Sequence, residues 1–164
     1  MIKITDATID DIPTIQDIAE KTWWPTFSKI LPAEQIRYML DTIYDGSTLA
    51  KSMADGSQRF ILLEAESRRC AFAAYGPRKE NPEIIKLHKI YILPECQGKG
   101  YGVELIDEIK RRLIAQKLSI LDLNVYRYNK AKTFYEKLGF NVIAEEDLPI
   151  GPYRLDDFVM RLII

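Results

Sequence analysis

The spacing of hydrophobic residues along the first third of the chain predicts helices after one short strand. The strand is expected at residues 2–4, and apolar positions at helical spacing then predict a helix that ends near Thr22. Residues 23–27, which hold two tryptophans and a proline, interrupt this spacing and are predicted to form a loop. A second helix is expected from Pro32 to Gly46, followed by a short one at residues 47–54.

Apolar runs of strand length dominate the middle of the chain. Residues 59–66 and 69–76 are expected to pair as a hairpin, with its turn at Ser67-Arg68. A third strand is predicted at residues 83–93, and Pro94 ends it.

The last third alternates between helical and strand patterns. The expected elements are a helix at 100–116, a strand at 119–126, a helix at 129–138, and strands at 140–146 and 155–163. The last two strands flank a turn-rich segment, residues 149–152. The order β–α–α–β–β–β–α–β–α–β–β predicts a mixed α/β fold. Its central sheet is antiparallel at first, becomes parallel through one β–α–β crossover over residues 84–125, and has helices on both faces.

Composition changes this picture only by exclusion. The 164 residues include 23 Lys and Arg against 24 Asp and Glu, so no basic excess indicates binding to nucleic acid. Hydrophobic residues make up 47% and charged residues 29%, which is typical of globular proteins. The length is that of one domain, expected to span residues 1–164.

The sequence also argues against export, membrane insertion and a metal site. The N-terminus lacks the apolar region of a signal peptide, and no apolar run approaches the length of a membrane span. Cys70 and Cys96 form no CxxC pair and have no histidine beside them, so no metal site is expected. A cytoplasmic location is the simplest expectation.

The most informative segment is a glycine-rich loop between a predicted strand and a predicted helix. Gly98, Gly100 and Gly102 let the backbone approach a ligand closely, and the helix N-terminus adds partial positive charge. Lys99 adds a full charge. The spacing is that of neither a dinucleotide-binding loop nor a Walker loop, so a different pyrophosphate ligand is predicted.

At this loop the sequence resembles a known family. Gln97–Gly102 is similar to the signature Gln/Arg-x-x-Gly-x-Gly/Ala of the GCN5-related N-acetyltransferases (GNAT). Residues 87–94 look like the strand that precedes this signature, and residues 123–125, 129–131 and 134–140 look like the second half of the family's core. The resemblance covers nearly the whole chain and implies the GNAT fold and acetyl-CoA as cosubstrate.

The resemblance also implies how acetyl-CoA is held. The backbone N–H groups that would bind its pyrophosphate belong to Gln97, Gly98, Lys99, Gly100, Tyr101, Gly102 and Val103. The main chain of Ile90, Tyr91 and Ile92 would pair with the pantetheine arm, with a bulge there aiming one N–H at the thioester oxygen.

The second half of the family's core implies further contacts. Asn124 and Asn129, with the neighbouring Ala131, would contact the lower part of CoA, and Tyr135 would protonate the leaving thiolate. Each has a purely structural alternative, because Asn129 is also a good helix cap and Tyr135 also fits a helix core.

Acetylation of an amine needs a group that takes its proton. His88 is the single histidine, and an ordinary pKa of about 6.5 suits this role. Strand alternation predicts that His88 shares a face with Ile90 and Ile92, opposite Tyr91. Glu64 on the neighbouring strand is the second candidate.

The acceptor site is expected between the first two helices. Its candidate residues are Trp23, Trp24, Phe27 and Tyr38, whose rings suit a cationic amine. This region resembles the polyamine acetyltransferase branch of the PaiA type, although the same tryptophans also fit a core or a dimer contact. The acidic pairs 145–146 and 156–157 are interpreted as solvated turns.

The predicted function is therefore direct transfer of an acetyl group to a small-molecule primary amine in a ternary complex, with a polyamine as the favoured acceptor. Protein or peptide amines are alternative acceptors, and a non-catalytic CoA-binding regulatory module is an alternative function. A homodimer is compatible with the resemblance, but the sequence marks no interface.

Overall fold

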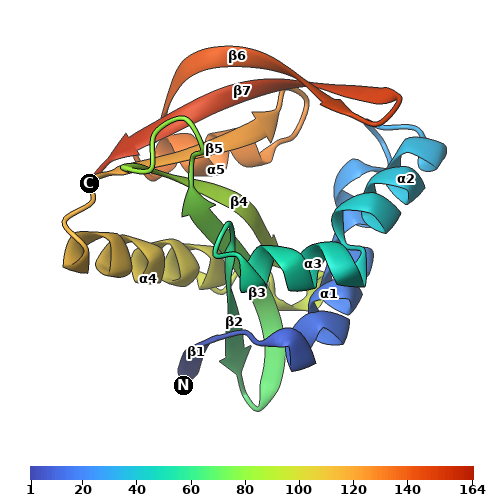
Figure 1. Cartoon of the computed structure of the whole chain (residues 1–164). Helices are drawn as coiled ribbons and strands as arrows, with labels where there is room; N and C mark the ends of the chain where they lie inside the picture. Colours follow the sequence, from blue (N-terminus) through green and yellow to red (C-terminus); the bar gives the residue numbers. More distant parts are fainter.

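The computed structural model of the chain describes all 164 residues, and its seven strands form one mixed sheet (Figure 1). The strands are β1 Ile2–Asp6, β2 Arg59–Ala65, β3 Arg68–Pro77, β4 Ile84–Ile92, β5 Ile120–Tyr126, β6 Asn141–Ile150 and β7 Tyr153–Ile163. Their order in the sheet is β1-β2-β3-β4-β5-β7-β6. Only β4 and β5 pair in parallel, so the predicted mixed sheet with a single crossover is confirmed.

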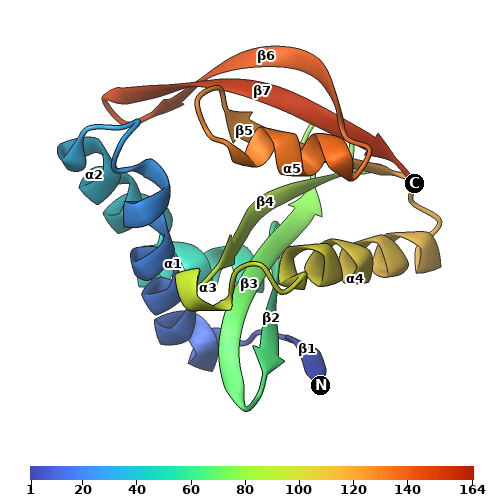
Figure 2. The ribbon, with the colours of Figure 1, turned by 180° about the vertical axis from the view of Figure 1, so that it is seen from behind.

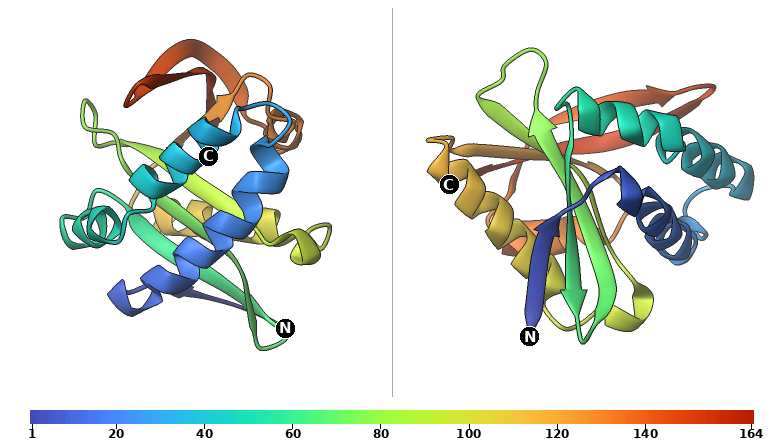
Figure 3. Two further views of the ribbon diagram at one scale, coloured as in Figure 1. Left: turned by 90° about the vertical axis from the view of Figure 1, so that its right-hand side faces the viewer. Right: turned by 60° about the horizontal axis from the view of Figure 1, so that its bottom comes forward.

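Helices cover both faces of this sheet. They are α1 Ile12–Phe27, α2 Ala33–Ile43, α3 Gly46–Ala54, α4 Tyr101–Ala115 and α5 Ala131–Lys137, with short 3-10 turns at Ile9–Asp11 and Pro94–Cys96. The right-hand view of Figure 3 shows α4 on one side of β1–β3 and α1–α3 on the other. No helix combines the length and the apolar character that a membrane crossing requires.

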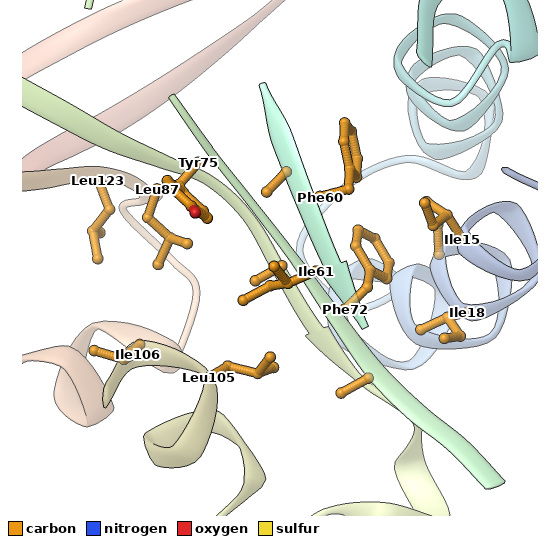
Figure 4. Close-up of a cluster of buried hydrophobic side chains, with 14 of the residues drawn as sticks. Ile15, Ile18, Phe60, Ile61, Phe72, Tyr75, Leu87, Leu105, Ile106 and Leu123 are labelled. Atoms are coloured by element: carbon orange, nitrogen blue, oxygen red, sulfur yellow. The ribbon is translucent and has the colours of Figure 1, made fainter. Parts of the chain in front are cut away.

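Strand alternation divides the core between the two faces. Phe60 and Phe72 point towards Ile15 and Ile18 of α1, whereas Ile61 points towards α4 on the opposite face (Figure 4). All of these side chains are at most 1% exposed. Burial of one such side chain contributes about 1.5–3 kcal/mol, so helices on both faces are held to the sheet by apolar contact.

The first helix is longer than predicted. It passes through Pro25 and ends at Phe27, so residues 23–27 are helical and the prediction of a loop was wrong. Trp23 and Phe27 lie four residues apart on one helix face, with ring centroids separated by 4.7 Å. Their burial extends the apolar stripe of α1, which compensates for the N–H that the proline lacks.

Other boundaries differ by a few residues. The β2–β3 turn consists of Glu66 and Ser67 rather than Ser67 and Arg68, and both have positive φ, 53° and 61°. Two such residues give a hairpin the right-handed twist of its strands. The final hairpin turns at residues 151–152, because β6 continues to Ile150 and β7 begins at Tyr153. The short helix expected at 47–54 is present as α3.

Candidate active site

The middle of the sheet opens where two parallel strands diverge. β4 and β5 pair from Ile84 opposite Ile120 to Leu87 opposite Leu123, and not beyond. Figure 2 shows the two strands separating past this point. A cavity of about 320 Å³ lies there, walled by β4, β5, α1, α5 and the β6–β7 hairpin. Because no strand pairs with this part of β4 on the β5 side, its backbone groups remain available to a ligand.

A β-bulge lies in β4 at this opening. Two consecutive residues of β3 pair with Leu87 and Lys89, so His88 is the extra residue. An extra residue changes which face the following side chains occupy. The bulge therefore interrupts the simple alternation from which the face of His88 was predicted. The bulge expected within Ile90–Ile92 lies at His88 instead.

The glycine loop ends in a row of unpaired donors. The prediction that the backbone N–H of Gln97 is free for the pyrophosphate was wrong, because it donates to the carbonyl of Pro94 at 3.3 Å. The backbone N–H groups from Gly98 to Val103 donate to no backbone carbonyl. Gly98 and Gly100 have φ angles of 78° and 82°, and a Cβ on either would meet no atom within 4 Å. These N–H groups join the positive end of the α4 dipole, which is the arrangement of an anion site.

The third glycine serves packing. A Cβ on Gly102 would lie 3.1 Å from Cζ of Phe134 and 3.2 Å from Cδ1 of Ile92, so glycine lets α4 approach both α5 and β4. The Gln97 side chain donates from Nε2 to the carbonyl of Ile92 at 3.1 Å and ties the loop to the end of β4. Lys99 is exposed beside this loop.

Comparison with known proteins agrees with this geometry. The model of the acetyltransferase (GNAT) domain matches residues 28–149. The chain belongs to this family. It is an acyltransferase, an N-acetyltransferase that takes its acetyl group from acetyl-CoA.

Individual relatives are distant but extend along most of the chain. A spermidine N(1)-acetyltransferase of Thermoplasma acidophilum is 28% identical over 148 residues, covering 86% of this chain and 89% of its own. A 5-NmdU N-acetyltransferase of Pseudomonas phage PaMx11 is 30% identical over 115 residues, covering 69% of this chain and 78% of its own. The crystal structure of PaiA N-acetyltransferase from Thermoplasma acidophilum with coenzyme A superimposes with a TM-score of 0.84 at 25% identity, covering 100% of this chain and 99% of that one.

In this acetyltransferase the Tyr135 side chain lines the cavity from α5. It is 9% exposed and packs edge-on against Phe134 and Phe140. Burial raises the pKa of Tyr135 well above its ordinary value, so the phenol keeps its proton at neutral pH. Tyr135 is therefore a core residue that also lines the cavity and keeps its phenolic proton.

The two asparagines differ in how they are held. Asn129 precedes the N-cap Lys130 and accepts the N–H of Ala131, the first residue of α5, on its Oδ1 at 2.9 Å, which leaves its amide Nδ2 available at the cavity. Asn124 on β5 donates from Nδ2 to Asp157 Oδ2 at 3.2 Å, while its own Oδ1 is buried without a partner.

The two candidate bases are separated by the fold. His88 lines the cavity, and its Nε2 is buried without a partner. Burial, with the nearby charges of Lys86, Lys89 and Arg78, lowers the pKa of His88 to about 3, so the imidazole is neutral at physiological pH. Glu64 lies on β2 opposite Lys3 and beside Arg69, and it does not line the cavity.

The four aromatic candidates on the acceptor side also separate. Trp23 and Phe27 line the cavity from α1. Trp24 points elsewhere, donating to Glu20 at 3.0 Å with the Arg37 guanidinium over its ring. Tyr38 packs on Tyr153, with ring centroids 5.4 Å apart, and so braces α2 against the β6–β7 hairpin that Figure 1 shows beside it.

The sequence analysis missed the charged residues of the cavity wall, which are Lys86, Lys89 and Asp157. Lys89 donates from Nζ to Gln58 Oε1 at 2.6 Å, and burial, with Lys86 nearby, lowers its pKa to about 8. Asp157 is 3% exposed, and burial raises its pKa to about 6. The interpretation of residues 156–157 as a solvated turn was wrong. Alternation along β7 from Leu155 to Val159 was the signal that points Asp157 inwards.

Proposed function

We propose that this acetyltransferase transfers the acetyl group directly to a primary amine, with both substrates bound at once and a polyamine as the acceptor. One observation carries the proposal. A single cavity between β4 and β5 is lined by Gln97 next to the anion-binding loop, by Asn129 before α5, and by Trp23 and Phe27 of α1. Two substrates that enter from the loop and from α1 meet without leaving the protein.

The cosubstrate side follows from the unpaired backbone groups. The N–H groups from Gly98 to Val103 bind the pyrophosphate of acetyl-CoA. The free edge of β4 at Ile90–Ile92 pairs with the pantetheine arm in the way that an added strand would. Asn129 Nδ2 and the Ala131 region contact the lower part of CoA.

Direct transfer is favoured over a covalent acetyl-cysteine. Cys70 and Cys96 are both 3% exposed, and neither lines the cavity. Burial is the main cause that raises the pKa of Cys70 to about 11, so its thiol is a poor nucleophile at neutral pH. The acceptor amine is then the group that attacks the thioester.

The acceptor class rests on the α1 side of the cavity and on one relative. The rings of Trp23 and Phe27 and the buried carboxylate of Asp157 suit a cationic amine. A relative with 28% identity is a spermidine acetyltransferase. Release of the CoA thiol, measured over a panel of polyamines, amino acids and peptides, tests the proposal. Faster release with peptides than with polyamines would favour a protein or peptide acceptor. If none of the amines caused release of the CoA thiol, a CoA-binding regulatory module would be favoured.

Tyr135 is the proposed acid that protonates the leaving thiolate. Tyr135→Phe removes the hydroxyl but keeps the packing against Phe134 and Phe140, so kcat should fall by about 10²-fold while the affinity for acetyl-CoA stays within about twofold. Steady-state kinetics and calorimetry measure the two quantities. Tyr128→Phe is the control, because Tyr128 is 62% exposed and outside the cavity. An unchanged kcat in Tyr135→Phe would exclude Tyr135 as the acid.

A further inference from the structure

The cavity collects unsatisfied polar atoms. Four buried side-chain nitrogen or oxygen atoms have no hydrogen-bond partner, and three of them belong to residues of its wall: His88 Nε2, Asn124 Oδ1 and Asp157 Oδ1. Buried polar atoms are nearly always hydrogen-bonded, because leaving one unpaired costs free energy. Three of them around one cavity indicate a polar ligand group that completes their bonding.

The chemistry of the two oxygens defines this group. The Asn124 amide donates to Asp157 Oδ2 at 3.2 Å and lies 3.4 Å from Glu146 Oε1. These bonds turn the nitrogen of Asn124 towards the acids, and its Oδ1, like Asp157 Oδ1, has no partner. A ligand with more than one N–H donor can satisfy both acceptor oxygens, and a primary ammonium has three.

We propose that Asn124 Oδ1 and Asp157 Oδ1 bind the amino group of the acceptor, and that Asp157 is the base that takes its proton. This inference rests on the proposed acetyl transfer and names the base for it. Neither Asp157 nor its role emerged from the sequence, which pointed to His88 and Glu64.

The step conserves protons and electron pairs. The ammonium loses one proton to Asp157 Oδ1, and the freed lone pair forms the C–N bond to the thioester carbon. The C–S bond then breaks. As the carbonyl re-forms, the departing sulfur takes a proton from Tyr135, and the second proton of the nitrogen passes to the Tyr135 phenolate, so that no net charge remains on the phenol. Asp157 releases its proton to solvent, and the products are the amide and the CoA thiol.

The surroundings of Asp157 fit a base that works near neutrality. Burial is the main cause that raises its pKa to about 6, Glu146 and Asp156 add to this, and Lys86 opposes it. Tyr91 and Tyr126, also nearby, keep their protons at neutral pH, because burial raises the pKa of each. Asp157 is therefore ionised above about pH 6 but holds a proton far better than His88, whose pKa is about 3.

The test compares Asp157→Asn with Asp156→Asn across pH, using the best amine of the panel. The neighbouring Asp156 is exposed and pairs with Arg127 at 2.8 Å, so its loss should leave the rate within about twofold. Asp157→Asn should lower kcat by about 10²-fold or more and abolish the acidic limb of the pH profile near pH 6. Asp157→Glu, which restores the carboxylate, should regain part of the rate and the limb.

Two controls separate the possible failures. Binding of acetyl-CoA to Asp157→Asn, measured by calorimetry, shows that the variant is folded. If Asp157→Asn does not fold, the rate and pH profile of Asp157→Glu are compared with those of wild type instead. Wild-type rate and pH profile in Asp157→Asn would overturn the assignment of Asp157 alone, as would loss of the limb in His88→Ala but not in Asp157→Asn. An inactive wild type would overturn the acetyl transfer itself, and the assignment with it.

Discussion

Two consecutive aspartates show how much environment decides at the scale of single residues. Asp156 is exposed and paired with Arg127, and this contact lowers its pKa. Asp157 points inwards from the same strand, is 3% exposed and has one oxygen without a partner. Strand alternation alone separates a solvated ion pair from a buried carboxylate. A buried carboxylate held for function costs stability whenever it is ionised.

This cost predicts a pH-dependent gain from Asp157→Asn. The pKa of about 6 in the folded protein lies above the ordinary value, so the free energy of unfolding falls as the pH rises from about 4 to about 6 and remains lower above that. With allowance for water in the cavity, the variant should be more stable than wild type by about 1–2 kcal/mol near pH 8. This gain should vanish near pH 4. Chemical denaturation at both pH values measures it, and an equal difference at the two would contradict the prediction.

At the scale of elements, the start of α4 brings together the unpaired backbone donors that are proposed to bind the cosubstrate. Six N–H groups without backbone acceptors and a helix N-terminus lie within one short segment, Gly98–Val103. Gly100 has a φ of 82° and precedes the first residue of the helix. The positive potential there comes from oriented peptide groups, so the protein needs no excess of basic residues to form an anion site.

Gly100→Glu should therefore weaken acetyl-CoA binding by at least about tenfold, because it adds a carboxylate where the pyrophosphate is proposed to bind. Gly56→Glu is a matched control. Gly56 has a φ of 75° and, like Gly100, no atom within 4 Å of an added Cβ, but it lies after α3, away from the cavity. Both variants should lose a similar amount of stability, about 1 kcal/mol. Calorimetry that shows equal affinity in the two would contradict the proposed role of the loop.

At the scale of the whole molecule, one buried ion network joins several strands of the sheet where β4 and β5 still pair. Asp122 on β5 is fully buried and accepts from Arg78 Nε at 2.9 Å and from Arg161 Nε at 2.7 Å. These contacts join the end of β3, β5 and β7 at the paired end of the opening. The network thus holds together the part of the sheet from which the two strands diverge.

Asp122→Ala should lower the free energy of unfolding by about 3–5 kcal/mol, because it leaves two arginines without their shared partner. Asp147→Ala is the comparison. Asp147 pairs with Arg154 at 2.7 Å, but both side chains are more than half exposed, so its loss should cost at most about 1 kcal/mol. Urea unfolding measures the free energy of unfolding of both variants. Equal losses would show that burial does not decide how much an ion pair contributes to stability.

Local patterns were sufficient for most of the elements and for half of the site. Glycine spacing marks the anion loop because positive φ and close approach are properties of single residues. The periodic spacing of hydrophobic residues predicts the helices and strands, including the crossover through α4. The stretch 23–27 was missed because burial of Trp23 and Phe27 outweighs the cost of Pro25, and burial is not a local property.

The sequence by itself determined the mixed fold, the glycine loop, the family and Tyr135 as the candidate acid, since each depends on residue types at fixed spacing. Tertiary structure alone decided which candidates meet. It brought Trp23, Phe27 and His88 to one cavity, left Trp24, Tyr38 and Glu64 outside it, and placed Asp157 inside. The physical reason is that a bulge, the divergence of two strands and the depth of burial all arise from contacts between distant segments. Those contacts set the direction of each side chain and the pKa of each acid and base.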